Sequence, residues 1–110
     1  MDLDRIVVAN ADPQAAKRIP QMREYAQELW AYARANGTPL TLASVQPDQD
    51  RIVLTVKDEI AKRQLLDAFS ADAAYRMGKD LAGNRRAYRR EGPNRRYEIG
   101  VATPQGVSAA

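Results

Sequence analysis

The segment from residue 19 to residue 39 constrains the fold most, because it has the spacing and the end signals of an amphipathic helix. Its apolar residues recur at steps of three and four, while charged residues fall elsewhere on the surface. The apolar positions are Ile19, Met22, Ala26, Leu29, Trp30 and Ala33. Gly37 suits a left-handed helix end, and Pro39 prevents continuation. The pattern predicts a helix from about Pro20 to Asn36 with one buried face.

A short lead-in is predicted before this helix. Asp12 can accept hydrogen bonds from the free N–H groups of a helix start, and Pro13 suits the first helical position. Because Pro20 interrupts soon afterwards, we expect residues 13–19 to form a separate turn or short helical piece.

Four segments have the composition or the alternation of β-strands. They cover residues 3–10, 40–46, 51–57 and 95–103. The first contains Ile6, Val7 and Val8 in a row, which indicates a strand with apolar residues on both faces. Pro47 and two aspartates separate the second and third segments, and these residue types favour a tight turn. We therefore expect those two strands to form a hairpin.

A second helix is predicted to begin at Asp58. Its apolar side is supplied by Leu65, Leu66 and Phe69. Beyond Ser70, however, Met77 and Leu81 are turned by about a quarter of a revolution from that side. We therefore expect a break near Ser70, which would cap a second helical piece that ends at residues 83–84.

The residues before the last strand are open to two interpretations. Residues 85–91, "RRAYRRE", are either the first arm of a hairpin closed by Gly92, Pro93 and Asn94, or a mobile loop.

The order strand, helix, strand, strand, helix, strand predicts an α+β fold. We expect a small antiparallel sheet with two or three helices packed on one face, in the ferredoxin-like β-α-β-β-α-β order. At 110 residues the chain has the length of one domain. We place this domain at residues 1–103, with an arginine-rich segment at 84–96, followed by a C-terminal tail at 104–110.

Two residue types are missing, and their absence excludes several kinds of chemistry. The chain has no cysteine and no histidine, so it has no disulfide, thiolate nucleophile or imidazole base. Ser44, Ser70 and Ser108 therefore have no histidine to activate them. No glycine-rich phosphate-binding motif occurs either. We expect no enzymatic activity, no catalytic residue and no cofactor.

Two pairs of aspartates come nearest to a metal or acid–base site. They are Asp48 with Asp50, and Asp2 with Asp4. Turns prefer aspartate for backbone hydrogen bonding, and a Mg²⁺ or Ca²⁺ site needs further oxygen ligands that no loop motif supplies. We expect no metal site. A small enzyme that uses only carboxylates is the weakest functional interpretation.

The N-terminal residues and the apolar runs bear on location. The first twelve residues are acidic and lack the basic start of a secretory signal, and apolar runs such as Ile6 to Ala9 are only a few residues long. A bilayer span needs about 20 apolar residues. We expect no export signal, no membrane contact, and a cytoplasmic or virion location.

Positive charge is concentrated at the C-terminal end. Residues 1–83 carry 11 Lys and Arg against 12 Asp and Glu, whereas residues 84–110 carry 6 Arg against two glutamates. Like charges this close repel unless solvent, salt or an anionic partner screens them. Guanidinium groups match carboxylates and phosphates in paired hydrogen bonds, and a tyrosine can stack on them. The predicted contact residues are Arg85, Arg86, Tyr88, Arg89, Arg90, Arg95 and Arg96.

These observations favour a non-enzymatic interaction or assembly module. We expect a structural subunit of a larger complex, such as a viral neck or tail ring or another scaffold, which docks through the arginine-rich segment. The partner is then an acidic protein surface, a second copy, or nucleic acid. The alternative is a freestanding nucleic-acid-binding protein with a basic β-ribbon. The plainest alternative is a solvated loop without a partner.

Overall fold

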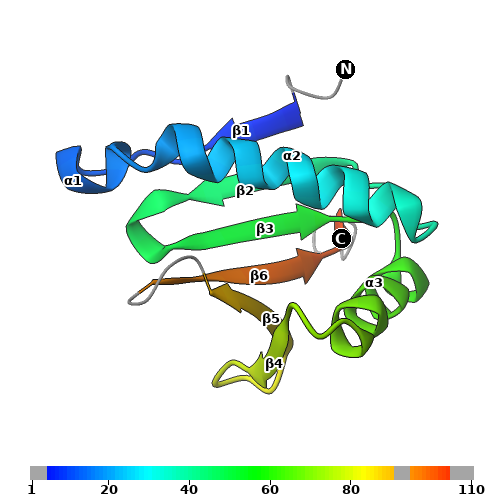
Figure 1. Cartoon of the computed structure of the whole chain (residues 1–110). Helices are drawn as coiled ribbons and strands as arrows, with labels where there is room; N and C mark the ends of the chain where they lie inside the picture. The colour runs from blue at the N-terminus through cyan, green and yellow to red at the C-terminus, as the bar shows by residue number, and fades with distance from the viewer. Residues whose placement is uncertain (1–4, 91–94, 105–110) are drawn as a thin grey trace.

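The computed structural model describes residues 5–90 and 95–104, which form one six-stranded sheet with helices packed on it (Figure 1). In chain order the elements are β1 (Ile6–Val8), α1 (Pro13–Ala16), α2 (Ile19–Ala35), β2 (Leu42–Gln46), β3 (Arg51–Thr55), α3 (Glu59–Ala71), β4 (Arg76–Lys79), β5 (Arg85–Arg90) and β6 (Arg96–Ala102). A 3-10 turn, Pro47–Gln49, joins β2 to β3. The predicted α+β class is confirmed.

The sheet is mixed. Its strands lie in the order β1-β2-β3-β6-β5-β4. β1 is parallel to β2 and β3 is parallel to β6, whereas the remaining neighbours are antiparallel. The prediction of a small antiparallel sheet is therefore wrong, and the ferredoxin-like order is not confirmed. Both parallel pairs follow from long connections through helices, because parallel strands cannot be joined by a tight turn.

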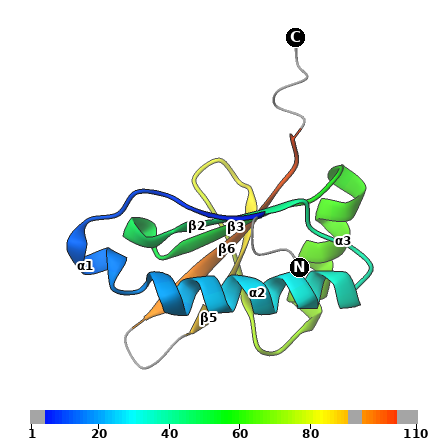
Figure 2. The same cartoon turned by 90° about the horizontal axis from the view of Figure 1, so that it is seen from above.

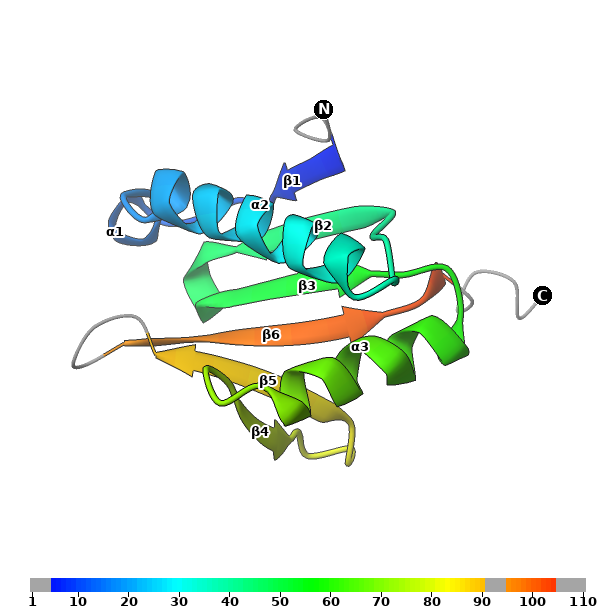
Figure 3. The same cartoon turned by 45° about the vertical axis from the view of Figure 1, so that its right-hand side comes forward.

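The two longer helices cover the same face of the sheet. α2 lies against β1 and β2, and α3 lies against β4, β5 and β6. Both helices stand in front of the strands in Figure 3, and Figure 2 shows α2 running along one side of them. The core between these layers includes Ile6, Met22, Leu29, Trp30, Val45, Ile52, Leu54, Leu65, Phe69, Tyr97 and Ile99. No described helix packs on the opposite side of the sheet, which we call the open face.

The helix starts follow the predicted capping signals. An Asp12 Oδ1 oxygen accepts the Ala15 N–H at 2.8 Å before α1, and Asp58 Oδ1 accepts the Ala61 N–H at 2.8 Å before α3. Each such cap is worth about 1 kcal/mol. After α2, Gly37 has the left-handed φ of +78° that an L-residue with a side chain rarely adopts. The predicted lead-in, the long helix and the start of α3 are confirmed.

The chain after α3 differs from the prediction. α3 ends at Ala71, so the break near Ser70 is confirmed, but residues 76–79 form the edge strand β4 rather than a second helical piece. Ser70 lies inside α3 and caps nothing. Asp72 instead makes a turn, because its Oδ1 accepts the Ala74 N–H at 2.9 Å. Met77 reaches the core from the strand, and Leu81 is fully exposed in the β4–β5 turn.

The hairpin interpretation of the arginine-rich segment is confirmed over the described residues. β5 pairs with β6 in antiparallel register, with Ala87 opposite Ile99 and Arg90 opposite Arg96. The predicted closing turn at Gly92 to Asn94 lies outside the described residues, as do Asp2, Asp4 and most of the predicted tail.

Candidate docking surface

Strand alternation divides the arginines between the two faces of the sheet. Ala87 is buried beneath the helices opposite Ile99, so its neighbours at even positions point the other way. Arg85 and Arg89 therefore lie on the helix side. Arg86, Tyr88, Arg90 and Arg96 lie on the open face.

The two helix-side arginines have partners within the chain. Arg85 Nη1 lies 3.0 Å from Asp67 Oδ1 of α3. The guanidinium carbon of Arg89 lies 4.9 Å from the centre of the Tyr25 ring. Burial raises the pKa of Tyr25 and of Tyr75, so both hydroxyls stay protonated beside this cation at neutral pH. These two arginines tie the helices to the sheet.

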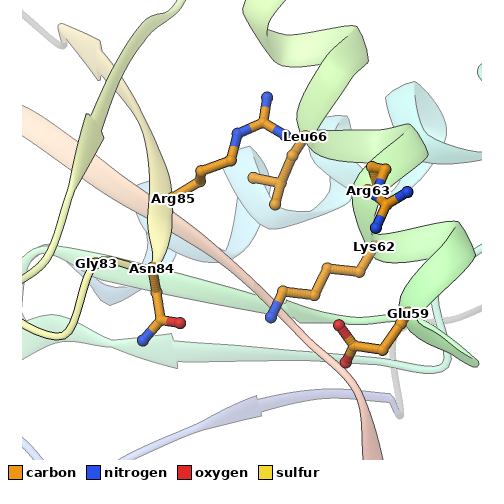
Figure 4. Close-up of a pocket in the computed structure, with 7 residues that line it drawn as sticks. All are labelled: Glu59, Lys62, Arg63, Leu66, Gly83, Asn84 and Arg85. Atoms are coloured by element: carbon orange, nitrogen blue, oxygen red, sulfur yellow. The ribbon is translucent and has the colours of Figure 1, made fainter.

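A small pocket lies between α3 and the β4–β5 turn (Figure 4). Its volume is about 230 Å³, and it is lined by Glu59, Lys62, Arg63, Leu66, Gly83, Asn84 and Arg85. Glu59 is the one carboxylate in this lining, and it accepts a hydrogen bond from the Thr103 hydroxyl at 3.0 Å. A lone carboxylate that is already bonded offers no acid–base pair and no metal ligand set.

On the open face, Arg86 and Arg51 share two carboxylates. Arg51 Nε lies 2.7 Å and Arg86 Nε 3.4 Å from Glu98 Oε2, and Arg86 Nη2 lies 2.9 Å from Asp80 Oδ2. The contacts with Glu98 do not have hydrogen-bond alignment, so they are charge contacts. Together these residues form a chain of alternating charges across the sheet, in which both arginines are screened.

The β4–β5 turn holds Asp80 in place for this contact. Its Oδ1 accepts the N–H groups of Asn84 at 2.8 Å and of Ala82 at 2.9 Å. The hydrogen bond from the Asn84 backbone is the largest cause of a lowered pKa of Asp80, and Arg86 adds to it. The turn therefore presents an ionised carboxylate to Arg86.

Beside this chain of charges lies a group centred on Tyr88, which we call the Tyr88 cluster: Arg76, Tyr88, Arg90 and Arg96. Arg76 is opposite Tyr88 in the β4–β5 register, and Arg90 is opposite Arg96 in the β5–β6 register. The guanidinium carbon of Arg96 lies 4.8 Å from the centre of the Tyr88 ring. No carboxylate of the described residues lies within ion-pair distance of these three arginines.

Two glycines make room for this arrangement. A Cβ on Gly78 would lie 2.9 Å from Cε2 of Tyr88, and a Cβ on Gly100 would lie 2.5 Å from Nη1 of Arg86. Both distances are shorter than a van der Waals contact, so the absence of a side chain lets Tyr88 and Arg86 lie flat across the neighbouring strands.

Arg95 lies outside the Tyr88 cluster and forms an ion pair at the turn between β2 and β3. Its Nη1 lies 3.0 Å from Asp50 Oδ1, which also contacts Arg18 Nε at 3.1 Å. Asp50 has a left-handed φ of 47° after the 3-10 turn, and Asp48 Oδ1 accepts the Asp12 N–H at 3.1 Å. The Asp48–Asp50 pair thus joins three segments of the fold. No group of three potential metal-ligating side chains occurs among the residues that the structure describes.

The predicted contact residues are therefore only partly gathered. Tyr88, Arg90 and Arg96 come together, Arg86 lies beside them in ion pairs, and the rest point elsewhere. Repulsion among the arginines is relieved within the chain at Arg85, Arg86 and Arg95. Arg76 was missed, because β4 has only four residues and its alternation is too short to place Arg76 on the outer face from the sequence.

Within the described part of the chain, no helix is both long enough and apolar enough to cross a membrane. Comparisons with protein-family models, with curated proteins and with solved structures found no significant match to this chain.

Proposed function

We propose that this chain is a non-enzymatic interaction module, a structural subunit of a larger assembly such as a viral neck or tail ring or another scaffold. It docks through the open face of its sheet, with Tyr88, Arg90 and Arg96 of the arginine-rich segment in the contact. The observation that carries the proposal is the Tyr88 cluster, whose three arginines share a helix-free face without a carboxylate in reach among the described residues.

Apolar residues on the same face favour a protein partner. Val7 is opposite Ser44, and Leu42 is opposite Thr55, so both point away from the helices. Val7 is 44% exposed and Leu42 is 36% exposed. Protein interfaces combine an apolar centre with arginine and tyrosine contacts. A protein surface can contact both the arginines and these apolar residues, whereas a nucleic acid backbone would leave Val7 and Leu42 without an apolar contact.

The alternative is a freestanding nucleic-acid-binding protein with a basic β-ribbon. β5 and β6 are interior strands, flanked by β4 and β3, so the described part of this ribbon is not free to enter a groove. Nucleic acid would instead have to lie across the open face, where Arg51 and Arg86 are already paired with Glu98 and Asp80 and so leave few cations for a phosphate backbone. We therefore rank this function second.

The proposal is tested with the full chain in its native source. Native mass measurement is expected to find it in a complex with protein that survives nuclease. Val53→Glu places a negative charge in the middle of the open face, opposite Ser44, and is expected to abolish the complex. Gln27→Glu adds the same charge on the exposed side of α2 and is the matched control. A chain that stays monomeric at every concentration, or a complex that tolerates Val53→Glu, contradicts the proposal.

A further inference from the structure

The Tyr88 cluster contains a pair of like charges that the fold places face to face. Arg90 and Arg96 are directly opposite each other on β5 and β6. Like charges in such cross-strand pairs destabilise a sheet. Glu98, two positions after Arg96 on the same face of β6, is already in contact with Arg51 and Arg86. An external anion that contacts both guanidinium groups would remove this repulsion.

The side chains of the cluster are also preorganised to bind such an anion. Arg96 stacks on the ring of Tyr88 at 4.8 Å, and Tyr88 in turn lies across Gly78. A stacked guanidinium keeps its N–H edge available and loses little rotamer freedom on binding. Its fork of donors matches the two oxygens of a carboxylate.

The small extent of the Tyr88 cluster favours a short acidic segment over a long polyanion such as nucleic acid. The three arginines of the Tyr88 cluster lie at the β4–β5–β6 side of the open face, and towards β3 the next charges are Glu98 with its partners Arg51 and Arg86. Farther on, Ser44, Val7 and Leu42 carry no charge. A long polyanion needs cations along its whole path. The described part of the open face offers cations without a carboxylate in reach at one end only, which suits a short acidic segment whose remaining contacts are apolar.

We infer that the Tyr88 cluster binds a short acidic segment of a protein partner, with glutamate or aspartate carboxylates held between Arg90 and Arg96. This inference rests on the proposed docking function and names the chemistry of the partner at that site. Arg76 adds a third positive charge beside Tyr88.

The test uses a labelled peptide of eight glutamates and the full chain, with fluorescence anisotropy at low salt. Arg90→Gln with Arg96→Gln is expected to weaken binding by about tenfold or more, because each residue forms charge-assisted hydrogen bonds with the peptide. The matched control is Arg23→Gln with Arg63→Gln, which removes the same charge from exposed positions of α2 and α3. We expect the control to change binding by less than about threefold, as salt-screened distant charges do.

A second pair of variants separates charge from geometry. Arg90→Lys with Arg96→Lys keeps both charges but loses the planar fork and the stacking on Tyr88, so we expect binding weaker than that of the unaltered chain. All the substituted positions are exposed, and equal thermal midpoints would show that each variant is folded.

The inference is overturned if the peptide does not bind, or if the Gln variants lose no more affinity than their control. It is also overturned if an octamer of single-stranded deoxythymidine binds more tightly than the peptide, which supports nucleic acid instead. A native protein complex that is unaffected by Arg90→Gln with Arg96→Gln removes the Tyr88 cluster from the interface but leaves the assembly function standing.

Discussion

At the scale of single residues, the open face depends on positions where a side chain is missing. Gly100 lies beneath the guanidinium of Arg86, and this close approach lets Arg86 reach both Asp80 and Glu98. Glycine weakens a strand by roughly 0.5–1 kcal/mol relative to alanine. Its presence in the interior strand β6 is therefore explained by what lies across it.

Gly100→Ala tests this dependence. The added methyl group displaces Arg86 from its carboxylates, so we expect the free energy of unfolding to fall by about 1 kcal/mol, the upper end for a lost ion pair that is partly exposed to solvent. In an Arg86→Ala background the same substitution meets no guanidinium, and we expect it to stabilise the chain by about 0.5 kcal/mol. Urea unfolding of the four proteins measures both effects. Equal effects in the two backgrounds would show that Arg86 and Gly100 are independent.

At the scale of elements, the β4–β5 turn is built around the ionised carboxylate of Asp80. Its oxygens accept from two backbone N–H groups, from the Asn84 side chain and from Arg86. These donors stabilise the charged form and hold the pKa of Asp80 below its ordinary value. Protonation would remove several acceptor contacts at once and loosen the turn.

The pH dependence of this turn follows from the direction of that shift. A lowered pKa in the folded state means that the stabilising contribution of Asp80 is complete above its ordinary pKa of 3.8 and is lost as pH falls through the folded value. We expect the difference in stability between the unaltered chain and Asp80→Asn to shrink below about pH 4, and the amide signals of Ala82 and Asn84 to titrate with it. A difference that stays constant down to pH 2 would contradict this role of Asp80.

Local signals predicted some elements well and others poorly. The caps at Asp12, Asp58 and Gly37 act within one turn of the chain, so α1, α2 and the start of α3 could be predicted. β4 has only four residues and one apolar contact with the core, Met77, which is too little for a visible alternation. The parallel pairings of β1 and β3 depend on contacts between distant residues, which no short pattern contains.

In the candidate site too, local features could be predicted from the sequence, whereas features that depend on distant residues could not. The number of arginines was visible in the sequence, but their distribution over two faces depends on the strand register of β5. Intramolecular ion pairs between distant residues, such as Arg95 with Asp50, could not be read from spacing. Repulsion that solvent, salt or an anionic partner has to screen therefore remains at Arg90 and Arg96, and not along the whole segment.

At the scale of the whole molecule, one face of the sheet carries the described helices, and we propose that the other face, which none of these helices covers, is the docking surface. Both longer helices lie on the first face, as Figure 3 shows, and the hydrophobic core fills the space between them and the sheet. The open face combines an arginine cluster, a neutralised chain of charges and exposed apolar residues. The central claim for the function of the chain is that the partner docks on the open face and not on the helices.

Hydroxyl-radical footprinting of the native complex, with and without the partner, tests this claim most directly. Radical attack labels exposed tyrosine, leucine and isoleucine side chains. We expect Tyr88 and Leu42 on the open face to become protected in the complex, while Ile60, which is 78% exposed on α3, stays as reactive as in the free chain. Protection of Ile60 with unchanged labelling of Tyr88 and Leu42 would contradict the claim, because the partner would then lie on the helices.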